Sequence, residues 1–378
     1  MDVGLSAEQR ILVDEVRRFS EERIRPGVAV RDREHTYPKE IMAELGGMGL
    51  LGMSVPEEYG GSGSSSLDLT LVIEEIARVC PSVAVSLIAS NSVCGWPISR
   101  FGSEDLKSRF LPGLAAGESL GAFAVTEPGA GSDAASMRTT ATRDGDEWIL
   151  SGEKSWITNA GVADVHLVLA RTDPEAGFWG ISAFVVPRDS PGLTVGAPEE
   201  KLGLRASVTA PLLFDDCRLP AANLLGREGQ GLVISMAALD HSRVGIAAQC
   251  VGIHQRALEL AVEYARQRVQ FGRPIAEFQA IRFIVAEMAT RLEAARGLTR
   301  AAAVAAGTRD AGRLASQAKL FASEAANRAC WDSLQIHGGN GFSEEYEIAR
   351  LYRDVRVTTI YEGTSEMQRQ IIARHLLQ

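Results

Sequence analysis

The spacing of apolar residues divides the chain into three stretches. Up to about Leu120 the apolar positions recur at helical spacing, and Ser6 followed by Gln9 forms a capping box at the first helix. From Gly121 onward, short apolar runs such as GAFAV and VHLVLA are separated by Gly and Pro turn signals, which predicts strands. Long helical runs then return. The expected domains are 1–120 (helical), 121–228 (antiparallel β, a small barrel or sandwich) and 229–378 (helical).

This order of elements argues against a dinucleotide-binding sheet. Helices, then strands, then helices do not give the alternation of a doubly wound α/β fold. Gly47, Gly49 and Gly52 match GxGxxG, but a strand should precede that motif and a helix should follow it. Here a helical run precedes it and a loop follows. We therefore expect these glycines to end a helix and form a turn.

Composition and charge remove several classes of function. The 378 residues carry a formal net charge of -9, and no long basic tract suggests nucleic-acid binding. Every apolar stretch is broken well short of a membrane span. The five cysteines are scattered, which suits a reducing compartment and gives no metal framework, and the histidines lack metal-ligand spacing. No GxSxG elbow or Walker loop is present. A cytoplasmic protein without a bound metal is the expectation.

Two motifs in the strand-rich stretch can hold a polar ring. FAVTEPGAGSD, from Phe123 to Asp133, runs a strand into a Pro-Gly-Gly turn whose backbone N–H groups are free to bind a heterocycle or pyrophosphate. An ordinary β-turn explains this segment equally well. WITNAG, from Trp156 to Gly161, adds an aromatic plane beside hydroxyl and amide groups. Trp156 suits either the core of the domain or stacking on a ring.

Three motifs follow in the C-terminal stretch. YARQRVQFG places Arg268 and Phe271 at a helix end, where Arg suits phosphate contact but is also common as a solvated end. QIHGGNG is a Gly-rich helix terminus, read equally well as a cap. IYEGTSE places Glu362 between apolar neighbours and a turn. Partial desolvation would raise the pKa of this carboxyl toward that of a useful base.

Together and in this order, TEPGAGSD, WITNAG, RxxFG, QIHGGNG and IYEGTSE resemble the acyl-CoA dehydrogenase family over essentially the whole chain. The likeness is strongest to its short- and medium-chain branches. The resemblance implies an α+β fold with an N-terminal all-α domain, a middle antiparallel β-barrel and a C-terminal four-helix bundle. It also implies bound FAD and a homotetramer described as a dimer of dimers.

Site residues carry over from the resemblance by position. Glu362 would be the catalytic base. The FAD-binding set would be Phe123, Val125, Thr126, Gly131, Ser132, Trp156, Ile157, Thr158, Arg268, Phe271, Gln279, Gln335, Ile336, Gly338, Gly339, Thr364 and Glu366. Of these, Arg268, Gln279 and the residues from Gln335 to Gly339 would reach FAD across a subunit interface. The substrate would contact Ser132, Asp240, Arg243, Tyr361 and Gly363, and the acyl pocket would include the segment from Asn91 to Phe101 with Trp96.

The implied reaction is fatty-acid β-oxidation chemistry. Glu362 would remove the α-proton of an acyl thioester, the flavin would take the β-hydride, and an electron-transfer flavoprotein would accept the electrons. Some family members place the base on a long central helix instead, and Glu362 favours the commoner arrangement. An acyl group on a carrier protein, a flavin oxidase or monooxygenase, and a non-catalytic helical binding protein remain as alternatives. Glu362 argues against the oxidases and monooxygenases of this fold.

Overall fold

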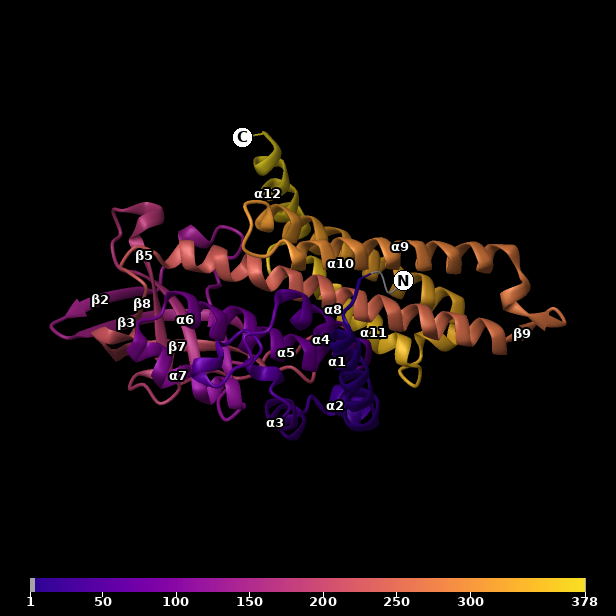
Figure 1. Cartoon of the computed structure of the whole chain (residues 1–378), viewed down its shortest axis with the longest axis horizontal. Helices are drawn as coiled ribbons and strands as arrows, with labels where there is room; N and C mark the ends of the chain where they lie inside the picture. Colours follow the sequence, from indigo (N-terminus) through magenta and orange to yellow (C-terminus); the bar gives the residue numbers. More distant parts are fainter. Residues whose placement is uncertain (1–3, 378) are drawn as a thin grey trace.

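The computed structural model describes residues 4–377. The N-terminal part is a cluster of short helices packed on one side of the long helices that follow (Figure 1). Two turns of π-helix, Ser20–Ile24 and Asn91–Gly95, lie between them. The helices are α1 (Ala7–Phe19), α2 (Val28–Glu34), α3 (Lys39–Gly47), α4 (Ser66–Val79), α5 (Pro81–Ser90), α6 (Trp96–Phe101) and α7 (Glu104–Ala116).

Local sequence signals account for several helix ends. The predicted capping box is present at α1, where the Ser6 side chain accepts from the Gln9 backbone N–H and the Gln9 side chain accepts from Ser6. Gly47 ends α3, and Gly49 turns the chain with a φ of 75°. The GxGxxG match is therefore a helix end and turn, as expected.

The middle of the chain forms a mixed sheet, and antiparallel pairs predominate. Its longest path runs β6-β7-β3-β2-β4-β5-β8, while β1 joins at β4. The predicted β domain is therefore confirmed as mainly antiparallel, with two parallel pairs that were not predicted: β1 with β4, where Gly121 lies opposite Val165, and β2 with β4 at Thr140 and Arg171. The β2–β3 hairpin lies between β1 and β4 in the chain, so β1 reaches β4 by a crossover. The strands are β1 (Gly121–Ala124), β2 (Thr140–Asp144), β3 (Glu147–Thr158), β4 (Val165–Arg171), β5 (Ile181–Pro187), β6 (Leu193–Val195), β7 (Thr209–Pro220) and β8 (Leu224–Leu225).

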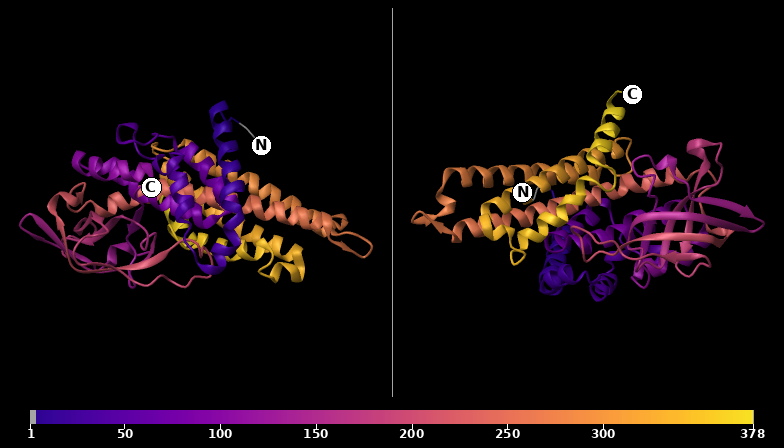
Figure 2. Two further views of the ribbon diagram at one scale, coloured as in Figure 1. Left: turned by 90° about the horizontal axis from the view of Figure 1, so that it is seen from below. Right: turned by 180° about the vertical axis from the view of Figure 1, so that it is seen from behind.

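The C-terminal part is a bundle built on one helix of 37 residues, α8. In Figures 1 and 2, α8, α9 and α10 run lengthwise side by side, with the sheet at one end and a small hairpin at the other. Helix α12 rises away from the bundle near the sheet end and carries the C-terminus (Figure 1). The elements are α8 (Gly231–Gln267), β9 (Val269–Gln270), β10 (Arg273–Pro274), α9 (Gln279–Val304), α10 (Ala311–His337), α11 (Glu347–Val355) and α12 (Ser365–Leu377).

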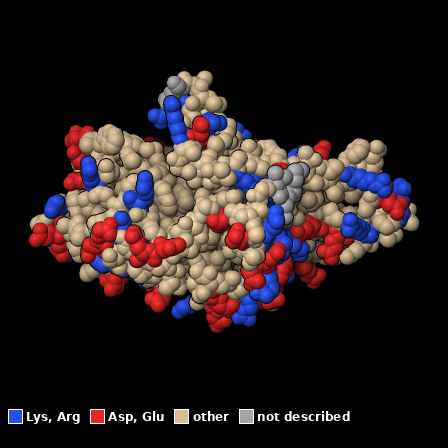
Figure 3. All heavy atoms as spheres, viewed as in Figure 1, with Lys and Arg blue, Asp and Glu red and all other residues tan. Residues whose placement is uncertain are grey.

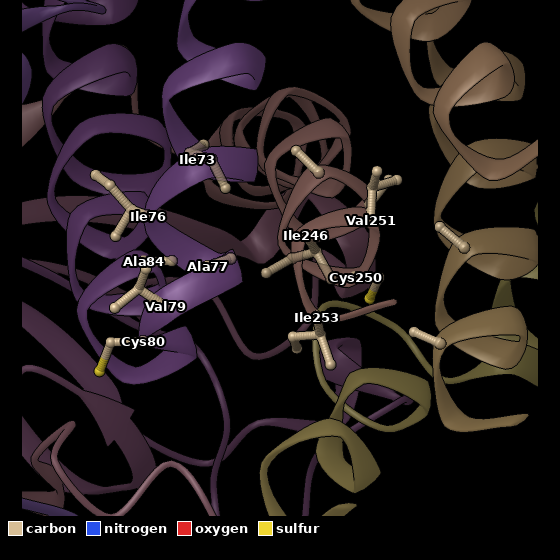
Figure 4. Packing of buried hydrophobic residues seen from close by; sticks show 14 of the residues in the cluster. Ile73, Ile76, Ala77, Val79, Cys80, Ala84, Ile246, Cys250, Val251 and Ile253 are labelled. Carbon is tan, nitrogen blue, oxygen red and sulfur yellow. The ribbon is translucent and has the colours of Figure 1, made fainter. Parts of the chain in front are cut away.

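Helix α8 is the centre of the main hydrophobic core. Figure 4 shows α8, which carries Ile246, Cys250 and Ile253, beside α4, which carries Ile73 and Ile76; all five side chains belong to one cluster and are almost fully buried. Because α8 also packs on α10, it is apolar around most of its circumference in this region. A helix held on several sides is a rigid support for any side chain it presents to a site.

The face of the molecule in Figure 3 carries no extended patch of charged side chains of one sign. Acidic and basic side chains mix along its lower edge, whereas the upper face over α9 and α10 is mainly uncharged. Within residues 4–377, no helix has the length and hydropathy needed to cross a bilayer. No group of three His, Cys, Asp or Glu side chains within that range is placed to hold a metal ion.

Candidate active site

A cavity of about 250 Å³ lies where the helical cluster, the sheet and the bundle meet. It brings together residues that are far apart in sequence, from α5, from the turn after β1, from β3, from α8 and from the loop before α12. Most of the predicted flavin and substrate residues line it. They are Phe123, Val125, Thr126, Gly131, Ser132, Trp156, Ile157, Thr158, Arg243, Tyr361, Glu362 and Gly363.

The loop that carries Glu362 has an unusual backbone. Glu362 and Gly363 adopt positive φ values of 55° and 89°, so the Glu occupies a left-handed conformation that non-glycine residues rarely adopt. Four hydrogen bonds to two carbonyls hold it there. Arg243 Nε donates to the Glu362 oxygen at 3.2 Å, and Lys319 Nζ donates to the Gly363 oxygen at 2.6 Å. Gln368 Nε2 donates to both, at 3.1 and 2.9 Å.

The Glu362 carboxylate is buried, and one of its two oxygens is hydrogen-bonded. Burial raises its pKa above the ordinary value for glutamate, while the Ser242 hydroxyl, Arg243 and Lys319 act in the opposite direction. Ser242 Oγ donates to Glu362 Oε2. The other carboxylate oxygen makes no hydrogen bond with any described residue. A desolvated carboxylate with one free oxygen, facing a cavity, can take a proton from a bound ligand.

The turn after β1 is clamped by a buried ion pair. Lys154 Nζ on β3 donates to Glu127 Oε1 at 2.7 Å and to the Val125 carbonyl at 3.2 Å. Glu127 also accepts from the backbone N–H groups of Arg138 and Thr139, at 2.6 and 3.0 Å. These donors hold the pKa of Glu127 below its ordinary value against the effect of burial. The turn from Thr126 to Ser132, which is predicted to bind a ring and is called the ring-binding turn below, therefore has a fixed shape.

A β-bulge presents Trp156 to the cavity. The register between β3 and β7 shifts between Lys154 and Ile157, and Trp156 takes a φ of 62°. Its side chain is 59% exposed in the single chain, which excludes the core interpretation. Glycines 129 and 131 in the facing turn have nothing within 4 Å of an added Cβ, so their backbone is open. An exposed indole, an open backbone and the hydroxyls of Thr126, Ser132 and Thr158 suit a flat polar ring.

The remaining predicted cofactor residues lie outside this cavity. One group is at the opposite end of the bundle, near the β9–β10 hairpin (Figure 1), where Phe271 is 94% exposed and Asn340 donates to Tyr264. Thr364 and Glu366 instead follow Glu362 at the start of α12. The distant group comprises Arg268, Phe271, Gln279, Gln335, Ile336, Gly338 and Gly339, and none of these lines the cavity within one chain.

The expected acyl-pocket segment lies mostly outside the cavity beside Glu362, and its role stays a prediction. Of the segment from Asn91 to Phe101, only Val93 lines the cavity beside Glu362. Trp96 lines a separate cavity of about 710 Å³ on another face of α8, where its ring stacks on His241 with centroids 4.7 Å apart. Asp240 also lines that second cavity and pairs with Arg243. The π-helical turn at Asn91–Gly95 rotates the residues after it away from the register of α5.

Several residues around the site were not predicted from sequence. Lys154 and Lys319 are fully buried lysines, and Ser242, Gln368 and Glu127 complete the contacts described above. A usable signal existed for Lys319, because it occupies an apolar position of an Ala-rich helical run, three residues before Ala322 and four after Ala315. A lysine in such a position needs a buried partner.

Comparison with known proteins agrees with this geometry. Family models for the acyl-CoA dehydrogenase N-terminal, middle and C-terminal domains match residues 6–118, 122–217 and 229–377. The human short-chain specific acyl-CoA dehydrogenase of mitochondria is 46% identical over 376 residues, covering 99% of this chain and 91% of that protein.

Solved structures agree over the full length of both chains. Butyryl-CoA dehydrogenase from Megasphaera elsdenii superposes with a TM-score of 0.97 at 43% identity. A chain from a study of the electron transferring flavoprotein of Acidaminococcus fermentans gives 0.98 at 42% identity. The chain therefore belongs to the acyl-CoA dehydrogenase family of FAD-dependent oxidoreductases.

Proposed function

We propose that the protein oxidises a short- or medium-chain acyl-CoA to the trans-2-enoyl-CoA, with Glu362 as the base that removes the α-proton. The observation that carries this proposal is the buried Glu362 carboxylate, which faces a cavity shared with the ring-binding turn and Trp156. Bound FAD supplies the hydride acceptor. The turn from Thr126 to Ser132 and the Trp156 indole would hold it against the substrate.

The residues of the Glu362 loop would also bind the thioester. Proton removal beside a thioester is difficult unless donors stabilise the developing enolate oxygen. The backbone N–H of Glu362 makes no hydrogen bond with any described residue and is the donor we assign to that oxygen. Arg243 and Gln368 hold the Glu362 carbonyl, which shares its peptide plane with the Gly363 N–H, so they restrict the loop directly after this donor. Tyr361 is fixed by its hydroxyl, which donates to Gln249 Oε1.

The size of the cavity supports a short acyl chain. Its aliphatic wall comprises Val85, Ile88, Ala89, Val93 and Leu239, and the cavity of about 250 Å³ must also accept part of the flavin. Each methylene that fits adds about 0.8 kcal/mol of binding. We therefore expect kcat/KM to stop rising before long-chain substrates, measured from butyryl- to palmitoyl-CoA. A value that keeps climbing through palmitoyl-CoA would contradict this specificity.

Replacement of Glu362 by Gln tests the reaction itself. Gln has nearly the same shape and keeps the backbone N–H, but it cannot accept the α-proton, and general-base removal costs about 10²- to 10⁴-fold. We expect Glu362→Gln to bind acyl-CoA with a spectral shift and to show almost no flavin bleaching in stopped flow. Bleaching within tenfold of the wild-type rate would remove Glu362 as the base. Measuring flavin reduction by the same acyl group on CoA and on a carrier protein distinguishes these two substrate classes.

We further propose a homotetramer in which each FAD is completed by a neighbouring subunit. Support comes from the exposed apolar side chains of α9, α10 and the hairpin, which include Phe271, Phe283, Phe321 and Trp331. They lie on elements whose upper face is mainly uncharged (Figure 3). A tetramer would bring the hairpin end of one bundle to the cavity of another. An electron-transfer flavoprotein is the proposed acceptor of the electrons.

The cross-subunit role can be tested at Arg268, the residue that caps the end of α8. We expect Arg268→Ala to lose FAD and tetramer together, because a charge-assisted contact contributes about 1.5–3 kcal/mol. Arg266→Ala, an exposed arginine on the last turn of the same helix, is the matched control. Full FAD occupancy of Arg268→Ala after gel filtration would refute the role.

A further inference from the structure

Ser242 stands between Glu362 and the backbone of α8. Its side chain is fully buried, and its hydroxyl lies within hydrogen-bond distance of two acceptors, Glu362 Oε2 and the Leu239 carbonyl oxygen at 3.2 Å. A hydroxyl has one proton to donate and lone pairs with which to accept. It can therefore donate to only one of these acceptors fully at any moment.

The other charged groups around Glu362 are committed elsewhere. Arg243 donates to the Glu362 carbonyl and to Asp240, and Lys319 donates to the Gly363 carbonyl. Among the described residues, Ser242 is the one whose side chain hydrogen-bonds the Glu362 carboxylate. The titratable and charged groups packed around the loop are Asp240, Arg243 and Cys250 on α8, Lys319 on α10, Tyr361 on the loop itself and Glu366 on α12.

We propose that Ser242 is a positioning residue whose hydroxyl reverses its hydrogen bond when Glu362 gains or loses a proton. While Glu362 is ionised, Ser242 donates to its Oε2 and leaves Oε1 free to face the ligand. Once Glu362 carries the proton and a half-turn of the carboxyl brings its O–H to the side of Ser242, the carboxylic acid donates to Ser242 Oγ, and the Ser242 proton turns to the Leu239 carbonyl. No covalent bond of Ser242 is made or broken, and the Ser242 hydroxyl keeps a hydrogen-bond partner in both states.

This inference rests on the proposed role of Glu362 as base and adds a second residue that sets its working pH. A donor to the ionised form favours that form. Without the hydroxyl, the buried carboxylate loses its hydrogen bond, and protonation becomes easier. We expect Ser242→Ala to move the titration of Glu362, and the acid limb of the flavin-reduction rate, upward by about one pH unit. At a pH on the acid limb, the variant should reduce its flavin about tenfold more slowly than wild type. On the alkaline plateau the two rates should be nearly equal.

The titration should be read directly on the holoenzyme by infrared difference spectroscopy of the protonated carboxyl, with Glu362→Gln to identify the band. This readout needs no turnover. If acyl-CoA fails to reduce the flavin, the proposed function fails, yet the effect of Ser242 on Glu362 is still measured. The acid limb of flavin reduction in stopped flow is the second readout.

The variants are chosen to separate the hydroxyl from its packing. Ser242→Thr keeps the hydroxyl and should retain the wild-type titration, and Ser242→Cys, close in size with a weak donor, should give an intermediate shift. Ser323→Ala is the matched control, because Ser323 on α10 is equally buried and donates to the carbonyl three residues before it at 3.2 Å. An unmoved Glu362 titration in Ser242→Ala, or in Ser242→Cys if the alanine variant does not fold, would overturn the proposal. So would an equal shift in Ser323→Ala.

Discussion

Two buried lysines support the two halves of the site in different ways. Lys154 in the sheet and Lys319 in the bundle are both fully buried, and desolvation lowers the pKa of each to about 8. Each donates to a backbone carbonyl beside the cavity, Val125 before the turn from Thr126 to Ser132 and Gly363 next to Glu362, the proposed base. Lys154 also pairs with the Glu127 carboxylate. Lys319 has no carboxylate in ion-pair contact among the described residues.

Because only one of the two lysines is paired with a carboxylate, their charges have different effects on the site. The Lys154 charge is neutralised by Glu127, so it fixes the shape of the turn and projects little field into the cavity. The Lys319 charge is left to act on its surroundings and lowers the pKa of Glu362 beside it. A paired lysine suits a static support, whereas an unpaired one can tune a titrating group. Variants at the two positions should therefore fail in different ways.

The largest expected effect is the loss of stability in Lys154→Met. The variant leaves the Glu127 carboxylate buried without its cation, which typically costs about 3–5 kcal/mol. The turn that should hold FAD would loosen as well. Urea unfolding of the FAD-free protein measures the loss. Lys154→Met/Glu127→Gln should recover much of it, because the uncompensated charge is gone. A double variant as unstable as the single one would contradict the ion-pair interpretation.

How far the sequence predicted these features depends on the range of the contacts involved. Helix ends set by neighbours, such as the Ser6–Gln9 capping box and the Gly47 end of α3, were predicted correctly. The Glu362 loop and the ring-binding turn were found through contiguous motifs, and the cavity brings them together. The roles assigned to individual site residues and the domain boundaries stay predictions.

Contacts between distant residues were not predictable in this way. The partners of Lys154, Lys319 and Ser242 lie 27, 44 and 120 residues away. No local pattern of polar and apolar residues encodes such a pairing. The parallel pairing of β1 with β4 was missed for the same reason. The separation of Trp96 from the Glu362 cavity was not predicted either, because a π-helical turn changes the helical register, and hydrophobic spacing does not reveal that change.

Lys319→Met should separate catalysis from stability. Removing a buried cation that has no carboxylate partner strands no opposite charge, and Gln368 still donates to the Gly363 carbonyl. We expect stability in urea to stay within about 1 kcal/mol of wild type, because the cost of burying the ammonium group and the hydrogen bond that it makes are removed together. The reduction rate near the acid limb should fall about tenfold, equivalent to ~1.4 kcal/mol, as the pKa of Glu362 rises. A loss of stability equal to that of Lys154→Met would break the comparison.

The smallest effect at neutral pH is a pH dependence of stability that belongs to Lys319. Its pKa in the folded protein is about 8, against an ordinary value of 10.5. Between these values the unfolded chain keeps a proton that the folded chain has released, so the free energy of unfolding gains from rising pH. The gain is at most ~1.4 kcal/mol per pH unit, and below about pH 8 it vanishes because both states are protonated.

Other groups titrate in the same window, so the measurement is a difference between two proteins. Burial raises the pKa of the Cys250 thiol and of Tyr361, and these groups cost stability as pH rises. Because they are present in wild type and in Lys319→Met alike, they largely cancel. Urea unfolding at a series of pH values measures the free energy of unfolding of both proteins. From about pH 8 upward, the value for wild type should rise relative to that for Lys319→Met, and below about pH 8 the difference between them should be constant. A difference that is flat across the whole series would mean that Lys319 stays protonated, and that its carbonyl contact alone compensates for burial.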